Sequence, residues 1–236
     1  MNKFITPLFL CVNIYFVSCT NNESINNKSL NPGSIYFDYQ VWGDEGSNEV
    51  TIKLQYRYRN AEGITILPEH TGKVEFDGRV LEADTSRMNG FYYEAILPLE
   101  NFGGEHSIVF TDLTNKQYKE EFDFPIIYLK KELASIISRK NLVLELAGSD
   151  TNEIVRVLLT DTSFYSRDID KTDTLRNEKI TITEMDLANL KNGPVHIEIF
   201  KEEERTLKEA TKAGGCLYLS FSLKRVLELK DDAHIP

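Results

Sequence analysis

The stretch Val50 to Arg59, VTIKLQYRYR, decides the fold of this chain. Apolar and aromatic residues at the even positions alternate with polar and charged residues at the odd positions. Because successive side chains of a strand point to opposite faces of a sheet, this period of two predicts a β-strand with one buried face. A second layer must cover that apolar face, so the rest of the chain is expected to supply more strands.

The neighbouring segments repeat this pattern. Residues 35–41 alternate in the same way, and Gly43 to Asn48 has the composition of a turn. Residues 73–82 predict a hairpin, because Asp77-Gly78 suits a two-residue turn. Further strands are expected at residues 91–97, 106–111 and 117–124. Short strands separated by turn signals predict an antiparallel sandwich that ends at Pro125.

The second half of the chain uses the same pattern. Apolar residues alternate at 142–146, 155–159, 180–182, 195–199 and 217–229, with Arg225 breaking the phase of the last strand. Gly214-Gly215 before that strand fits a bend or bulge. Ile126 to Ser138 fits a short helix or an extended linker, and Lys201 to Lys212 fits a helix or a strand end with a long hairpin turn. We expect an all-β chain of two tandem immunoglobulin-like β-sandwich domains.

The N-terminal segment predicts the location of the protein. Lys3 precedes the mostly apolar residues 4–17, which are too few to span a membrane and fit a cleaved signal peptide. Ser18-Cys19 then suits the lipoprotein signal peptidase, which would leave Cys19 lipidated as the first mature residue. Lipid chains such as palmitate on Cys19 would hold the protein at a membrane. An ordinary secretory signal cleaved elsewhere is the alternative.

These observations predict the domain organisation. A lipoprotein signal peptide is expected at residues 1–18 and a polar tether at 19–33. The first sandwich is expected at 34–127, the second at 128–232, and a short tail at 233–236.

Three motifs carry a resemblance to a known group: Phe16 to Cys19, Gly103 to His106, and Gly214 to Leu217. With these motifs the chain resembles Bacteroidota-type lipoproteins that carry tandem immunoglobulin-like domains and have no assigned activity. The resemblance implies the architecture and a place in the cell envelope, as an outer-membrane lipoprotein on the periplasmic or surface face. Thr20, where an inner-membrane lipoprotein often has Asp, favours the same membrane. The resemblance transfers no catalytic residue.

Charge and cysteine content exclude some classes of partner. The net charge is −10 and basic residues form no block, which argues against nucleic acid and anionic lipid as partners. Of the three cysteines, Cys11 would leave with the signal and Cys19 would be lipidated. Cys216 then has no partner for an intrachain disulfide, and we expect it to be structural.

The sequence lacks the common signatures of enzymes and cofactor sites. It contains no GxSxG elbow, P-loop, dinucleotide fingerprint or HExxH motif. His106 and His196 occupy equivalent strand starts, which favours a shared structural role over a site. Asp168, Asp170 and Asp173 superficially resemble a calcium loop, but the glycine and the downstream glutamate are missing, so a solvated acidic loop is preferred. No catalytic residue, metal or cofactor is expected.

Exposed aromatic residues offer the remaining functional signal. Tyr36 and Trp42 fall on the polar side of the first strand, and Tyr92 falls opposite its neighbours Phe91 and Tyr93. Flat aromatic faces can stack on sugars or peptides, although packing on the linker or the other domain is the alternative. The expected function is a membrane-anchored lipoprotein with a structural or binding role and no catalysis. A glycan- or peptide-binding surface module is the second candidate and a hydrolase the third.

Overall fold

The computed structural model of the chain describes residues 30–148, 152–163 and 167–231. The predicted signal peptide, Cys19, most of the tether and the C-terminal tail lie outside the described residues.

Nearly all of the regular secondary structure in the described part of the chain is strand, so the all-β prediction is confirmed. The strands are β1 (Ile35–Asp44), β2 (Glu49–Tyr58), β3 (Lys73–Phe76), β4 (Arg79–Val80), β5 (Ala83–Ser86), β6 (Gly90–Pro98), β7 (Glu105–Thr111), β8 (Gln117–Asp123), β9 (Tyr128–Leu129), β10 (Ile136–Ser138), β11 (Leu142–Ala147), β12 (Ile154–Asp161), β13 (Ile169–Thr174), β14 (Lys179–Ile182), β15 (Gly193–Thr206) and β16 (Gly215–Lys230). The short helices are η1 (Pro32–Ser34), η2 (Pro68–His70), η3 (Leu99–Asn101) and α1 (Glu184–Leu187).

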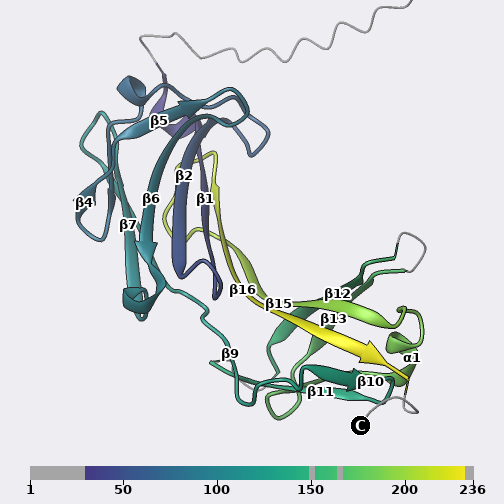
Figure 1. Cartoon of the computed structure of the whole chain (residues 1–236). Coiled ribbons are helices and arrows are strands. Elements are labelled where there is room, and N and C mark those ends of the chain that lie inside the picture. The colour runs from purple at the N-terminus through teal and green to yellow at the C-terminus, as the bar shows by residue number, and fades with distance from the viewer. Residues whose placement is uncertain (1–29, 149–151, 164–166, 232–236) are drawn as a thin grey trace, which may run out of the picture.

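The strands form two immunoglobulin-like sandwiches on one shared sheet. The nine-stranded sheet has the order β13-β12-β15-β16-β1-β2-β6-β5, and β10 also pairs with β16. The four-stranded sheet β4-β3-β7-β8 covers its upper part, and the sheet β14-β11-β9 covers its lower part (Figure 1). We call these units the upper sandwich and the lower sandwich. The predicted Asp77-Gly78 hairpin joins β3 to β4, with positive φ at both turn residues.

A long hairpin belongs to both sandwiches. Residues Phe37–Asp44 of β1 pair in parallel with Gly215–Ser222 of β16, and β15 pairs with β16 along its whole length. The predicted division placed all of residues 128–232 in the second sandwich. In the structure, the tip half of this hairpin instead completes the upper sheet. Alternation reveals that a strand has a buried face but not which core buries it.

The tip of this hairpin is tied to the upper sandwich by polar contacts. The carboxylate of Glu120, which is 1% exposed, accepts hydrogen bonds from the Arg205 guanidinium and, at 2.9 Å, from the backbone N–H of Lys208. Glu209 accepts the backbone N–H of Lys119 at 2.9 Å, so the tip covers the edge strand β8. Gly215 lies so close to Phe37 that a Cβ would come within 2.9 Å of the Phe37 Cβ, which explains the second glycine of the Gly-Gly pair.

Arg225 does not break the phase of β16, contrary to the sequence-based prediction. The odd-numbered residues Leu217 to Leu223, Leu227 and Leu229 are all buried on the same face of the sheet. Arg225 keeps this phase and fills the inward position between the two cores. Its guanidinium binds both oxygens of Glu132, at 2.9 and 2.8 Å, and also binds Glu45 in the β1–β2 turn.

Neither of the two ambiguous stretches is a helix, and one predicted loop is a strand. Residues 126–138 contain the short strands β9 and β10, and residues 201–212 are the end of β15 followed by a hairpin turn. The predicted acidic loop is β13, in which Asp170 and Asp173 fall on opposite faces of the sheet. Asp170 binds the Arg156 guanidinium through both oxygens at 2.7 Å, so the aspartates do not converge.

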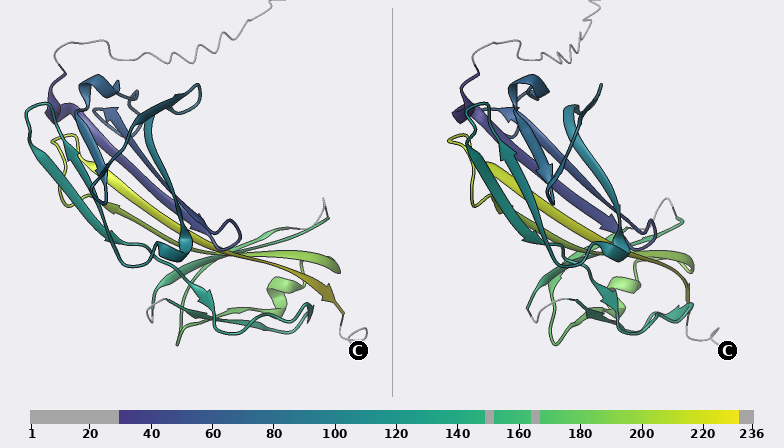
Figure 2. Two further views of the ribbon diagram at one scale, coloured as in Figure 1. Left: turned by 60° about the vertical axis from the view of Figure 1, so that its left-hand side comes forward. Right: turned by 90° about the vertical axis from the view of Figure 1, so that its left-hand side faces the viewer.

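Both covering sheets pack on the same face of the shared sheet, which leaves its other face open. The two sandwiches meet at an angle, and this open face lies on the inner side of the bend (Figure 1). The first described residues lie at the free end of the upper sandwich, and the last lie at the opposite end of the molecule (Figure 2). The bend therefore sits far from the end at which the N-terminal segment enters.

Candidate binding trough

The open face of the shared sheet carries a hollow of about 390 Å³ on β1, β16 and β15. Its floor is Ser220 and Ser222 of β16. In register, Trp42 and Glu202 lie on either side of Ser220, and Asp44 and Phe200 lie on either side of Ser222. Small side chains on the middle strand between larger ones on its neighbours create the depression. We call it the Trp42 trough.

Aromatic side chains from three strands surround the trough. Trp42 is 39% exposed, which is a large open fraction for a tryptophan on a sheet. Phe200 and Tyr218 are half-buried, and the guanidinium of Arg156 lies 5.7 Å from the centre of the Phe200 ring. Because Arg156 is itself held by Asp170, the lower sandwich fixes one wall of the trough.

Polar groups complete the lining. The Tyr218 hydroxyl donates a hydrogen bond of 2.6 Å to Glu202. Burial and this hydrogen bond raise the pKa of Tyr218, so the hydroxyl stays protonated at neutral pH. Gln40 and Lys224 stand at the two ends of the trough. Aromatic faces and a few placed polar groups in one hollow are the usual composition of a ligand site.

Of the three predicted aromatic residues, the structure places only Trp42 in this trough. Tyr36 lies at the far end of β1, beside Arg57 of β2. Tyr92 lies near the sheet edge, where its hydroxyl donates to Asp84 at 3.3 Å and Lys53 lies over its ring. The sequence analysis did not select Phe200 and Tyr218. Both stand at outward positions of alternating strands, which is the same pattern that selected Trp42.

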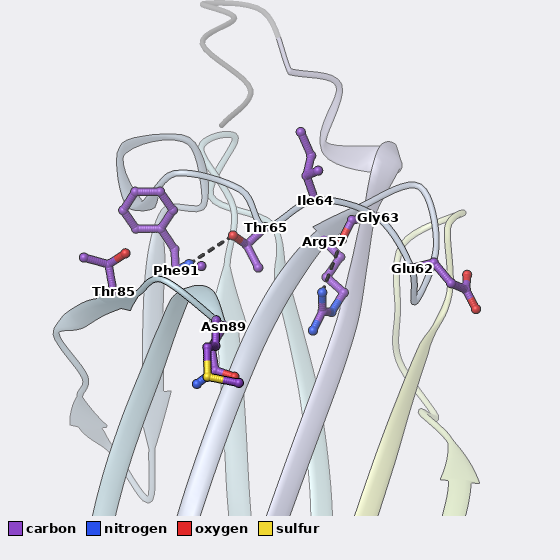
Figure 3. A pocket seen from close by; sticks show the side chains of 10 residues that line it. Arg57, Glu62, Gly63, Ile64, Thr65, Thr85, Asn89 and Phe91 are labelled. Atoms are coloured by element: carbon purple, nitrogen blue, oxygen red, sulfur yellow. Dashed lines mark hydrogen bonds between the residues drawn. The ribbon is translucent and has the colours of Figure 1, made fainter. Parts of the chain in front are cut away.

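A second hollow of about 400 Å³ lies at the free end of the upper sandwich, between the loops that follow β2 and β5 (Figure 3). Its charged residues are Glu62 and Arg57. The Arg57 guanidinium already binds Asp38 at 2.8 Å, Gln55 at 2.7 Å and the Gly63 carbonyl at 3.2 Å. The remaining wall includes Thr65, which accepts the backbone N–H of Phe91. The Arg57 guanidinium is thus engaged by the protein, and this hollow has one aromatic ring, that of Phe91, where the trough has three, so it offers a ligand less than the trough does.

The other residues with chemical potential are not assembled into a site. His106 is buried against Phe102 with its Nδ1 2.8 Å from Asp77, whereas His196 is exposed, so the two histidines share no environment. Across residues 30–148, 152–163 and 167–231, no group of three or more His, Cys, Asp and Glu side chains is placed to hold a metal ion. The same residues contain no helix long and apolar enough to cross a membrane.

Comparisons with known proteins were made for the whole chain. No protein-family model and no curated protein matches it. The fibronectin(III)-like modules of Clostridium thermocellum CbhA match at 14% identity and a TM-score of 0.22, over 80% of this chain and 89% of that one. A tetra-tandem repeat from the extending region of a large adhesion protein matches at 13% identity and a TM-score of 0.24, over 82% of this chain and 49% of that one.

A third solved structure is SGBP-B of the Bacteroides ovatus mixed-linkage glucan utilization locus, in complex with a mixed-linkage heptasaccharide. It matches at 11% identity and a TM-score of 0.24, over 78% of this chain and 54% of that one. The chain thus spans about half the length of the adhesion repeat and of SGBP-B. At these TM-scores the likenesses carry no argument about what the chain binds.

Proposed function

We propose that the chain is a non-catalytic binding protein of the cell envelope, anchored through Cys19, which holds its ligand in the Trp42 trough. The observation that carries the binding role is the trough itself, with three aromatic side chains around a floor of small hydroxyls. The outer-membrane location rests on the sequence-predicted lipidation site. A purely structural role is the alternative, and it would not explain the exposed aromatic side chains of the Trp42 trough.

The binding role can be tested through the intrinsic fluorescence of the protein. Trp42 is the single tryptophan of the 236 residues, so its emission reports on the trough alone. We expect a soluble ligand to shift that emission and protect Trp42 from acrylamide quenching. Probes would be a panel of soluble polysaccharides and a pool of random peptides. If no probe protects Trp42, the trough is not a binding site and the structural role stands.

The anchor has its own test. Replacing Cys19 with Ser removes the acceptor for lipid, so we expect the unprocessed or soluble form to accumulate. The measurement is membrane fractionation, with mass spectrometry of the mature N-terminus. A Cys216→Ser variant is the matched control and should fractionate as the unchanged protein does. A Cys19→Ser protein that matures normally and stays with the membrane would refute lipidation.

A further inference from the structure

We propose that the ligand of the Trp42 trough is an uncharged glycan chain laid along β16. This inference rests on the proposed binding role and adds the chemical class and direction of the ligand.

The shape of the trough fits an elongated ligand. Its lining residues on β16 run from Tyr218 to Lys224, six positions apart, which is about 20 Å of strand. The walls stand on β1 and β15, which flank β16 on either side and are therefore about 10 Å apart. A trough twice as long as it is wide accepts a chain better than a compact small molecule.

The lining matches the two-sided chemistry of sugar rings. A sugar ring presents an apolar C–H face, which the rings of Trp42 and Phe200 can cover, and a rim of hydroxyls. Asp44 already accepts the backbone N–H of Ser47, and Glu202 accepts the Tyr218 hydroxyl. Each carboxylate has further lone pairs that can accept from sugar hydroxyls, while Ser220 can both donate and accept. Aromatic and polar groups alternate from one strand to the next, so a single glycan chain can contact both kinds of group.

The charges around the trough disfavour an anionic glycan. In register with its lining residues stand Glu198, beside Lys224, and Glu204, beside Tyr218. Together with Asp44 and Glu202 these carboxylates outnumber Lys224, and Arg156 is already paired with Asp170. A polyanion would therefore meet net repulsion.

The position of the trough also disfavours an extended peptide. Peptides that add to a sheet use the free backbone groups of an edge strand. The trough lies instead on the face of three inner strands, whose ladders pair β1 with β16 and β16 with β15. Side-chain stacking and hydroxyl contacts remain, and these are what a glycan uses.

The test is electrophoresis of the full chain in native gels that contain a polysaccharide. The neutral probes are hydroxyethyl cellulose, galactomannan, α-mannan and dextran, and the anionic probes are alginate and polygalacturonate. We expect at least one neutral probe to retard the protein and neither anionic probe to do so. Trp42→Ala and Phe200→Ala should each weaken retardation by at least about tenfold, the size expected for an aromatic anchor. Ser220→Tyr, which fills the floor, should abolish it.

The matched control is Ile96→Ala. Ile96 is 54% exposed on the same sheet face but lies outside the trough, so retardation should be unchanged. If an anionic probe or a random peptide binds in a Trp42-dependent way and no neutral probe does, the glycan assignment is overturned while the binding role survives. If neutral probes retard the protein equally with Trp42→Ala, the trough assignment is overturned. If nothing binds, both proposals fail.

Discussion

At the scale of single residues, Cys216 shows how the fold suppresses reactivity. The thiol lies on the open face of the sheet, half-buried, with its sulfur 3.5 Å from a carboxylate oxygen of Glu204. Burial and the neighbouring Glu204 carboxylate raise the pKa of Cys216 to about 11. Because the thiolate is the nucleophile, the thiol is nearly inert at neutral pH.

We therefore expect iodoacetamide to alkylate Cys216 in the native protein about a hundred-fold more slowly than a thiol of ordinary pKa. The measurement is peptide mapping by mass spectrometry at neutral pH, with the unfolded protein as reference. Glu204→Gln should speed the reaction, because it removes the negative charge beside the sulfur. Fast alkylation of the native protein, accompanied by loss of ligand binding, would instead make Cys216 a functional group.

Only part of the Trp42 trough could be predicted from the sequence. Trp42 was found because it stands on the polar side of an alternating strand. Phe200 and Tyr218 stand on equally polar sides, but they join Trp42 only through the parallel pairing of β1 with β16. Nothing local in the sequence sets a pairing between residues more than 170 positions apart, so the site could not be assembled from sequence.

At the scale of elements, Arg225 fixes the bend between the two sandwiches. It joins the β1–β2 turn to the segment between β9 and β10 through Glu45 and Glu132. The Arg225 hydrogen bond lowers the pKa of Glu132. A lowered folded-state pKa stabilises the fold above the ordinary pKa of the group, and that stabilisation is lost as the pH falls through the lowered value.

We expect Arg225→Met to lower Tm by a few degrees at pH 7, and the difference from the unchanged protein to shrink as the pH drops into the acid range. The measurement is thermal unfolding followed by circular dichroism across that pH range. Arg79→Met, at an exposed position on β4, is the matched control and should leave Tm unchanged. A difference in Tm that persists in acid would show that Arg225 acts through packing and not through its ion pairs.

Elements with a strict period of two were predicted well, and those without it were missed. Residues 50–59 and 117–124 alternate cleanly, and they correspond to the strands β2 (Glu49–Tyr58) and β8 (Gln117–Asp123). β13 carries polar or charged residues on both faces after Ile169, so its composition indicates a loop. What makes it a strand is the ladder to β12 in the same hairpin and the pairing of Asp170 with Arg156, and neither contact can be seen in the composition of residues 169–174 alone.

At the scale of the whole molecule, the upper sandwich depends on the hairpin that follows the lower one. A fragment of residues 30–127 would keep β2 but lack β16, the other strand that pairs with β1, and would leave that edge of β1 unpaired and exposed. It would also lose Leu217, Leu219 and Phe221 from the core, each of which is at most 1% exposed. We expect this fragment to be insoluble or unfolded by circular dichroism.

The control restores the hairpin without the lower sandwich. The Phe124 and Phe221 rings lie 6.1 Å apart, and Phe221 pairs with Lys201, so a short Gly-Ser linker can join residue 124 to residue 200. We expect a chain of residues 30–124 and 200–224 joined in this way to fold cooperatively. A stable, soluble fragment 30–127 would show that the two sandwiches are independent after all.

The parallel pairing of β1 with β16 also determines how the molecule bears a mechanical load. If the protein is held by its N-terminal end while a cargo pulls on the opposite end, the force enters β1 at its start and leaves through the end of β16. The two strands are then loaded in shear along eight paired positions, so their hydrogen bonds resist together instead of opening one after another. Survival under such a pull is set by the rate of forced unfolding. Shear loading slows that rate, so the parallel pairing of β1 with β16 makes the molecule resistant to a pull between its two ends.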